Sequence, residues 1–556
     1  MKKTYLLFPL TLGLLLGSCA LNGQNSSESK PKEEDAATSS ASAEQPTSTS
    51  ESSAEKSSSS ESKESSSSSE ASSSSEASSS VDTEGPFIKE KTEITFMSNS
   101  SYGDLLDSFI ESFQKLEPNV TVTNTKESAS YDGVKDKVIE QIAVKNYPDL
   151  VVLYPDAIGT LMDYGIVTQL DDYIGNPSYG WSEDDLDDYV PTYLEEGTHY
   201  TVEGTYSLPF AKSTEAMFYN KGVLINLNLS SIDPTINEGK PLSEEYINNL
   251  TWDELFDKLC PAIMKYNDTL DDDHKILKDN GTYTKAIFGY DSDDNFFITL
   301  AEQHGYGYTA VDPVTGEGKL LFNIDDIDSD GDGVNDTNGM KQLVKKFKGA
   351  YDKGYLFTKG SSNGGNYTNY SFTADSCLFT IGSTGGLKYQ VASDGHLDTA
   401  VARIPQAPEG DGHKTAIINQ GPSICLLDHG DDNRTLASWL FYKHMTNSIN
   451  SLRWSAETGY SPIRYSSMES TDYLDIASEE GKTAGSLDMV KARVASYVAR
   501  KDVADYLYTS PVFKGSDEAR EQVGSIITTV FTKEGADETF IDETFDAAEN
   551  TVKTKM

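Results

Sequence analysis

The sequence predicts an α/β fold, with a parallel sheet covered on both faces by helices and with more than one folded body. The stretch from Pro148 to Ala157 is a continuous apolar strand pattern between helical patterns, which is typical of a buried parallel sheet. The 556 residues exceed what one ordinary core accommodates. The stretch from Thr205 to Leu224 combines a strand that ends at Pro209, a polar crossing and a second apolar strand, as expected of a bridge between two bodies.

The N-terminal region is expected to export and anchor the chain. Residues 1–18 start with two lysines and continue as an apolar run too short to span a membrane, which is the pattern of a signal peptide. The run ends in Leu-Gly-Ser before Cys19, which resembles the bacterial lipobox, where the cysteine thiol carries a lipid. Residues 19–85 are expected to form a disordered tether, because their Ser- and Glu-rich composition buries too little apolar surface to fold.

Strand and helix patterns alternate from about Lys89 onward. The spacing of the apolar residues distinguishes a strand pattern from a helix pattern. Ser101 and Asp104 form a predicted capping box. The first body is predicted to contain helices at 104–116 and 134–145 and strands at 93–97, at 120–123 and in the stretch 148–157, where Tyr154, Pro155 and Asp156 close the strand. The rest of the chain is predicted to contain helices near 251–259, 338–352 and 435–454, strands near 374–383, 401–405 and 417–427, and a largely helical end.

Three polar segments are predicted to converge at one edge of the first sheet. In an open α/β sheet the ligand crevice lies at the carboxyl ends of the strands. The loops at Asn99–Tyr102 and Tyr154–Asp156 follow predicted strands, and the polar crossing at Lys212–Glu215 leaves the same body. We therefore expect a ligand cleft that is walled by these segments.

The order of the segments resembles the extracellular solute-binding proteins of sugar ABC importers, of the family 1 type that includes maltose- and glycerol-phosphate-binding proteins. The resemblance covers Lys91 to about Gly515 and rests on YPDLVVLYPDAIGTLMDYGIV, YSLPFAKSTEAMFYNKGVL, TWDELFDKL, LFTIGSTGG, ARIPQAP and TGYSPIR together. It implies a two-lobed periplasmic-binding-protein-like fold (type II), with crossing strands and a sugar between the lobes. The boundaries are then 86–210 with 424–462 for the N-lobe and 211–423 with 463–556 for the C-lobe.

The expected sugar site combines planar aromatic faces with polar side chains, because sugars present C–H faces and hydroxyl groups. The Gly-rich loop at Ser383-Thr384-Gly385 lacks the aromatic residue that many relatives carry there. A cleft with Lys212 as its fixed cation would also admit a phosphorylated sugar. The candidate ligand residues are Asn99, Ser100, Tyr102, Tyr154, Asp156, Phe210, Lys212, Ser213, Ser383, Thr384 and Tyr460.

An acidic loop is the sharpest local motif and predicts a structural Ca²⁺ site. Asp residues alternate before Gly333, and the spacing matches the first nine positions of a calcium loop, although Gly339 stands where the closing acid belongs. A solvated acidic turn is the alternative. The predicted ligands are Asp328, Asp330, Asp332, the Val334 carbonyl and Asp336.

Composition and motifs exclude other classes. The net charge of −44 without a basic block disfavours nucleic-acid binding. The cysteines after Cys19 show no CxxC spacing, the histidines show no metal-ligand spacing, and the GxSxG match at 360–364 lies in a loop rather than a strand-to-helix turn. We therefore expect a binding protein rather than an enzyme, with no cofactor other than Ca²⁺.

The expected function is that of a lipid-anchored extracellular substrate-binding subunit of an ABC importer. Its expected partners are a carbohydrate, with an oligosaccharide as the expected form, the permease and the membrane that holds the lipid. The chain is expected to be a monomer. A secreted carbohydrate-active hydrolase and a glycan-binding surface adhesin are the alternatives. Turnover of an oligosaccharide would indicate the first, and attachment without uptake would indicate the second.

Overall fold

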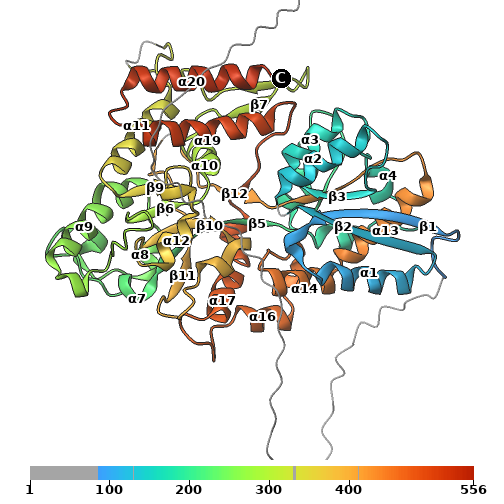
Figure 1. Cartoon of the computed structure of the whole chain (residues 1–556), viewed down its shortest axis with the longest axis horizontal. Coiled ribbons are helices and arrows are strands. Elements are labelled where there is room, and N and C mark those ends of the chain that lie inside the picture. Colours follow the sequence, from blue (N-terminus) through green and yellow to red (C-terminus); the bar gives the residue numbers. More distant parts are fainter. Residues whose placement is uncertain (1–84, 129, 330–332, 411) are drawn as a thin grey trace, which may run out of the picture. The chain divides into compact units, whose positions relative to one another are not determined.

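The computed structural model describes residues 85–128, 130–329, 333–410 and 412–556 (Figure 1). All of them belong to one compact unit, Asp82–Met556. Within these described ranges, two sheets each carry their own hydrophobic core and thus form two lobes. The signal peptide, Cys19 and the tether lie outside the described residues.

The first lobe is built on a five-stranded sheet in the order β2-β1-β3-β13-β4. Strands β1 (Thr92–Asn99), β2 (Val120–Ser128) and β3 (Leu150–Leu153) are parallel, whereas β13 (Ser423–Leu426) runs antiparallel to β3 and to β4 (Leu208–Pro209). This sheet follows the predicted α/β pattern.

Helices cover both faces of this sheet, as the continuous apolar strands predict. Phe96 of β1 packs with α1 (Leu105–Leu116) and α13 (Asp432–Met445), while its neighbour Met97 belongs to the opposite core with α2 (Tyr131–Ile142) and α3 (Pro155–Met162). Successive side chains of a strand point to opposite faces of the sheet, so alternate side chains of β1 pack into the two cores on either side of it.

The second lobe is built on a mixed seven-stranded sheet in the order β14-β12-β5-β10-β6-β9, with β11 also paired to β5. Strand β5 (Ser213–Asn220) is buried along its whole length and runs antiparallel to its neighbours. The other strands are β6 (Phe288–Tyr290), β9 (Leu356–Thr358), β10 (Phe379–Ser383), β11 (Thr399–Ala402), β12 (Ile417–Gln420) and β14 (Leu507–Tyr508).

Several helices pack around this second sheet (Figure 1). The longer ones are α9 (Cys260–Thr269), α10 (Asp293–His304), α11 (Gly339–Asp352), α17 (Leu487–Val498), α19 (Ser516–Thr532) and α20 (Glu538–Lys553). The shorter elements of the two lobes together are α4 (Asp171–Ile174), α5 (Glu183–Asp187), α6 (Pro191–Glu195), α7 (Lys221–Leu224), α8 (Glu244–Asn248), β7 (Thr309–Val311), β8 (Gly318–Leu320), α12 (Thr368–Thr373), α14 (Ser448–Thr458), α15 (Tyr465–Met468), α16 (Thr471–Ala477) and α18 (Lys501–Ala504).

Two of the segments by which the chain crosses between the lobes lie next to each other. The chain leaves the first sheet after Pro209 and enters β5 at Ser213, and it returns between β12 and β13 through Gly421. A Cβ at Gly421 would lie 2.0 Å from the Ala211 carbonyl oxygen, and Gly421 has a φ of +91°. Only glycine permits the two crossings to lie this close together.

Three local predictions are wrong. The segment Tyr154–Asp156, predicted as a loop after the strand, instead starts α3, because Pro155 occupies the first helical turn, where a missing N–H costs nothing. The predicted capping box is absent. Instead, the Asn99 side chain accepts from the Ser101 N–H at 2.8 Å and caps a 3₁₀ turn. The helix predicted over 435–454 is divided in two, since the Asn447 side chain caps a new helix, α14.

The cysteines of the described chain are free and buried. Cys260, Cys377 and Cys425 form no disulfide. Burial raises the pKa of Cys377 and of Cys425 to about 12. Within the same residues, no helix combines the length and apolar character needed to cross a membrane.

Candidate functional site

A cavity of about 790 Å³ lies where the lobes meet, and we call it the tyrosine cavity. The first lobe contributes the 3₁₀ turn Ser100–Tyr102, the start of α3 and the end of α14. The second lobe contributes the end of β10 and the 3₁₀ segment Thr384–Gln390. Its lining residues are Ser101, Tyr102, Asp104, Leu105, Ser108, Tyr154, Tyr367, Ser383, Gly385, Gly386, Lys388, Tyr389, Arg453, Glu457, Thr458 and Tyr460.

Aromatic rings hold one another in place on the first-lobe wall. The ring of Tyr102 lies edge-on to Trp454, with centroids 4.8 Å apart, and Trp454 stacks on Tyr460 at 6.2 Å. Tyr131 lies edge-on to Tyr154 at 4.9 Å. Rings fixed in this way present rigid apolar faces to a ligand at little cost in conformational entropy.

The hydroxyl groups of this wall form a hydrogen-bonded group. The Tyr102 and Tyr131 hydroxyls share one hydrogen bond, and the Tyr131 and Tyr460 hydroxyls lie 3.5 Å apart. Burial and the neighbouring phenols raise the pKa of Tyr102 and of Tyr131 well above the ordinary value. Each phenol therefore stays neutral at physiological pH and can both donate to and accept from a polar ligand.

The Gly-rich loop closes the cavity from the second lobe. A Cβ at Gly385 would lie 2.9 Å from Cε1 of Tyr460, so the loop backbone rests against that ring. Ser383 Oγ accepts from the Gly385 N–H at 3.2 Å and donates to Ser213 Oγ at 3.1 Å. Tyr389 is 59% exposed and supplies an aromatic surface just beyond the loop.

The structure brings some of the predicted ligand residues together at this cavity and places others behind it. Tyr102, Tyr154, Ser383 and Tyr460 line it. Asn99 is buried and caps the 3₁₀ turn that starts at Ser100. Phe210 packs behind the wall on Trp454, with ring centroids 4.6 Å apart.

The polar crossing at Lys212–Glu215 lies inside the protein instead of on the cavity wall. Ser213 is buried and receives the hydrogen bond from Ser383. Thr384 is also buried, and its hydroxyl accepts from the Thr214 N–H at 3.1 Å.

Sequence reasoning missed Tyr131, Tyr367, Lys388, Tyr389, Arg453 and Glu457. Tyr389 follows the Gly-rich loop by about one helical turn, so a search beyond Gly385 could have found it. Arg453 and Glu457 lie one turn apart on α14, but the sequence did not show that this helix ends at the cavity.

Lys212 does not line the cavity. Its side chain is fully buried, forms an ion pair with Glu196 and donates to the Gly421 carbonyl at 3.0 Å. Glu196 also accepts from Asn419 Nδ2 and from Ser423 Oγ, each at 3.0 Å. Burial lowers the pKa of Lys212. This pair fixes the two crossing segments to each other, and its cation is already compensated.

Asp156 also takes part in an interlobe contact. It lies in the first turn of α3 and accepts from Ser516 Oγ of the second lobe at 3.0 Å. Burial raises the pKa of Asp156, whereas the nearby Arg520 opposes that shift. Lys135 of α2 pairs with Asp517 at 3.5 Å, so the first turns of α19 meet two helices of the first lobe.

The predicted calcium loop is described only in part. Asp330 and Asp332 lie outside the described residues. Asp328 Oδ2 accepts from the Gly333 N–H at 2.8 Å, and Asp336 accepts from Ser329 Oγ at 2.9 Å. Val334 is exposed. In the part of the chain that the structure describes, no cluster of His, Cys, Asp and Glu has the arrangement of a metal site.

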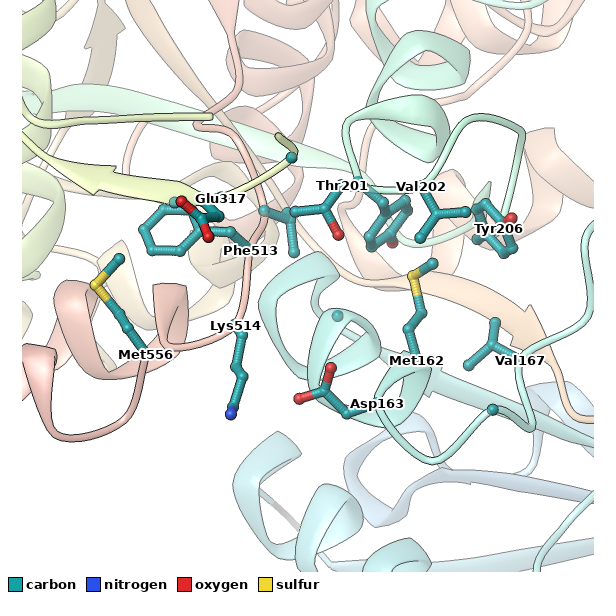
Figure 2. A pocket seen from close by; sticks show the side chains of 16 residues that line it. Met162, Asp163, Val167, Thr201, Val202, Tyr206, Glu317, Phe513, Lys514 and Met556 are labelled. Atoms are coloured by element: carbon teal, nitrogen blue, oxygen red, sulfur yellow. The ribbon is translucent and has the colours of Figure 1, made fainter. Parts of the chain in front are cut away.

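A second cavity of about 680 Å³ has a different chemistry (Figure 2). Its labelled side chains include Met162, Val167, Phe513 and Met556, with charged groups such as Asp163 around them. None of the predicted ligand residues lines it. The tyrosine cavity combines aromatic faces with neutral hydroxyl groups, so it suits a polyhydroxylated ligand better.

Solved structures share this fold. UgpB from Mycobacterium tuberculosis, in complex with glycerophosphocholine, is 18% identical with a TM-score of 0.57, and the match covers 83% of this chain and 98% of that one. The cyclic alpha-maltosyl-1,6-maltose binding protein of Arthrobacter globiformis is 16% identical with a TM-score of 0.56, over 84% of this chain and 99% of that one. An ABC substrate-binding protein from Listeria monocytogenes, in complex with cycloalternan, is 14% identical with a TM-score of 0.55, over 84% and 100%.

The predicted two-lobed fold is thus confirmed, and sequence comparison carries the assignment further. The family model of the bacterial extracellular solute-binding proteins matches residues 108–478. This match confirms a binding protein rather than an enzyme. The chain is a member of the bacterial extracellular solute-binding protein family.

Proposed function

We propose that this protein is the lipid-anchored substrate-binding subunit of an ABC importer and that it binds an oligosaccharide in the tyrosine cavity. The observation that carries the proposal is that both lobes contribute tyrosines to one cavity: Tyr102, Tyr154 and Tyr460 from the first, Tyr367 and Tyr389 from the second. A sugar stacked between such walls would hold the lobes together.

The chemistry of the wall fits a neutral polyhydroxylated molecule. Tyrosine rings offer planar faces for the C–H surfaces of a pyranose, and their neutral hydroxyls can donate and accept hydrogen bonds. A volume of about 790 Å³ is in the upper part of the usual range for small-molecule sites, which favours several sugar units. Of the similar solved structures, one is a cyclic alpha-maltosyl-1,6-maltose binding protein and another is in complex with cycloalternan, which supports the same ligand class.

Titration calorimetry against mono- and oligosaccharides tests the proposal. We expect one or more oligosaccharides to bind, and Tyr154→Ala and Tyr460→Ala each to weaken binding at least about tenfold, as loss of a stacking face does. Tyr164→Ala is the matched control, because Tyr164 is exposed and lies outside the cavity. Equal affinity in all three variants would place the sugar elsewhere. An unchanged oligosaccharide after long incubation separates binding from the hydrolase alternative.

The anchor and partners form the second part of the proposal. A lipid on Cys19 would hold the chain at the outer face of the cell membrane, next to a permease that receives the sugar, and the chain would act as a monomer. Cys19→Ser should release the protein into the medium without changing its sugar affinity. Retention of this variant on washed cells would contradict the lipid anchor, and light scattering of the pure protein measures its oligomeric state.

A structural Ca²⁺ ion in the acidic loop is the third part. The Gly333 backbone has a φ of +87°, which suits the sharp turn of a calcium loop, and Asp328 already closes onto it. Bound Ca²⁺ would relieve repulsion between the loop carboxylates.

A further inference from the structure

A row of exposed tyrosines leads out of the tyrosine cavity over the second lobe, and we call it the tyrosine row: Tyr389, Tyr367, Tyr370 and Tyr283. Tyr389 and Tyr367 line the cavity and are 59% and 50% exposed. Tyr370 is 45% exposed, and it lies outside the cavity together with the half-buried Tyr283. Exposed apolar side chains that gather in one place mark an interaction site, which makes the row a candidate binding surface.

The contacts between its members make the row continuous. Tyr367 precedes α12, and Tyr370 lies about one helical turn further on, where its N–H donates to the Tyr367 carbonyl at 3.2 Å. The Tyr370 ring stacks on Tyr283, with centroids 5.7 Å apart and an angle of 28° between the ring planes. Asn369, between the two tyrosines of α12, donates through Nδ2 to the Tyr389 carbonyl at 3.1 Å. The row therefore starts in the cavity and ends outside it at Tyr283.

The backbone beneath these rings is held by hydrogen bonds. The Thr368 N–H and hydroxyl donate to Asp291, directly after β6, at 2.7 and 3.0 Å, which fixes the start of α12. The Thr284 hydroxyl, next to Tyr283, accepts from the Asn363 N–H at 2.8 Å. The two chain segments that carry the row are thus tied to each other and to the second sheet. Rings on a fixed backbone lose little conformational entropy when a ligand stacks on them.

The surface around α12 suits a carbohydrate. The stretch 359–374 contains no Asp or Glu, although the chain as a whole has a net charge of −44. A carboxylate there would lose its water when a neutral ligand covers it, at a cost in free energy. Lys359 lies 4.2 Å from the centroid of the Tyr367 ring, and Lys388 lies 5.0 Å from that of Tyr389. Both rings remain at least half exposed beside these lysines, so each keeps open surface for a sugar.

We propose that the tyrosine row binds the outer units of a long glycan whose inner units occupy the tyrosine cavity. Tyr367 and Tyr389 belong to both surfaces, so one chain of sugar units can pass from the cavity onto Tyr370. Sugar units stack their C–H faces on the rings and use the neutral phenols as hydrogen-bond partners. This inference rests on the proposed sugar-binding function and narrows its substrate class to extended glycans that project from the cavity.

A length series tests the inference. The wild type and Tyr370→Ala are titrated calorimetrically with malto-, isomalto-, cello- and xylo-oligosaccharides, each from the disaccharide to the longest soluble member. In a series that binds, we expect Tyr370→Ala to weaken binding of the longest members about three- to tenfold, as loss of an aromatic stacking partner does. The shortest member that binds should keep its affinity, because it is held in the cavity alone. Tyr283→Ala should give the same pattern.

Two further variants show whether the ring is the cause. Tyr370→Phe keeps the stacking face, so it should bind the longest members nearly as tightly as the wild type. Tyr164 is the matched control, because it is 47% exposed and lies outside both the row and the cavity. Tyr164→Ala should therefore change no affinity.

Several results would overturn the inference and leave sugar binding intact. One is an unchanged affinity for the longest members in Tyr370→Ala and Tyr283→Ala, and another is an equal loss for short and long members. A dimer in light scattering that Tyr370→Ala dissociates would mean that a second copy covers the row. Slower sugar uptake by cells that carry Tyr370→Ala, with normal glycan affinity, would assign the row to the permease. If no oligosaccharide of these series binds the wild type, the proposed function itself fails.

Discussion

Replacing Lys212 by Met should destabilise the fold and leave sugar affinity unchanged. Lys212→Met would leave Glu196 buried beside Asn419 and Ser423 without its counter-charge. Breaking a buried ion pair by removing one partner costs about 3–5 kcal/mol. The two hydrogen bonds that Glu196 keeps favour the lower end, so we expect a loss of about 3 kcal/mol.

The double variant tests whether the pair is the cause. The double variant, Glu196→Gln with Lys212→Met, removes both buried charges of the pair. Its introduced Gln side chain can still accept a hydrogen bond from Asn419 or Ser423. The double variant should therefore be more stable than Lys212→Met alone, with a coupling energy of about 2 kcal/mol. Urea unfolding followed by tryptophan fluorescence measures the wild type, Lys212→Met, Glu196→Gln and the double variant, and calorimetry measures the sugar affinity of each one at a temperature where it is folded.

Two results would refute this reasoning. Purely additive effects of the two substitutions would mean that Lys212 and Glu196 do not act as a pair. A loss of sugar affinity above about tenfold in a Lys212→Met protein of normal stability would mean that Lys212 contacts the ligand, as the sequence alone suggested.

Further predictions concern the cavity loop, a buried carboxyl and the acidic loop. Gly385→Ala would push its Cβ against Tyr460 at 2.9 Å and should weaken sugar binding by about tenfold, whereas Gly386→Ala, with its nearest contact at 4.0 Å, should bind normally. Equal affinities would contradict the close approach. Burial raises the pKa of Glu215 from 4.5 to about 7, so folding is favoured by protonation and stability should fall as the pH rises from 4.5 to 7. Glu215→Gln should remove up to about 3 kcal/mol of that pH dependence, as measured by urea unfolding. If the unfolding free energies of the wild type and the variant change in parallel with pH, Glu215 is not the group responsible. A chelator should lower the melting temperature of the wild type and have no effect on Asp328→Asn, while a wild type indifferent to both chelator and added Ca²⁺ would disprove the calcium site.

The sequence was sufficient for the layered first lobe, because continuous apolar strands and helical periodicity are local signals. The Phe96 and Met97 pair shows this, since each enters the core that alternation predicts. Boundaries failed where a single residue decides them. Pro155 starts a helix where a loop was expected, and Asn447 divides one predicted helix into two.

The ligand residues were harder to predict from the sequence than the fold. Whether a polar side chain faces the cavity or is buried depends on partners that only the tertiary structure brings to it. Tyr102, Tyr154 and Tyr460 follow from strand and turn positions, and they do meet in one cavity. Lys212 looks like a cleft cation in the sequence, but its partner Glu196 lies in a segment with no motif of its own. Tyr389 was missed for a different reason, since it lies just beyond the Gly-rich loop, where no ligand residue was sought.

The buried, unreactive cysteines make the folded part of this chain a convenient optical reporter. Thiol reagents attack the thiolate, so Cys377 and Cys425, with pKa values near 12, should stay unmodified under conditions that label an exposed thiol. A cysteine placed at Tyr389, on the rim of the cavity, would then take up a dye without removal of the buried Cys260, Cys377 and Cys425. The fluorescence of that dye would follow sugar capture in real time.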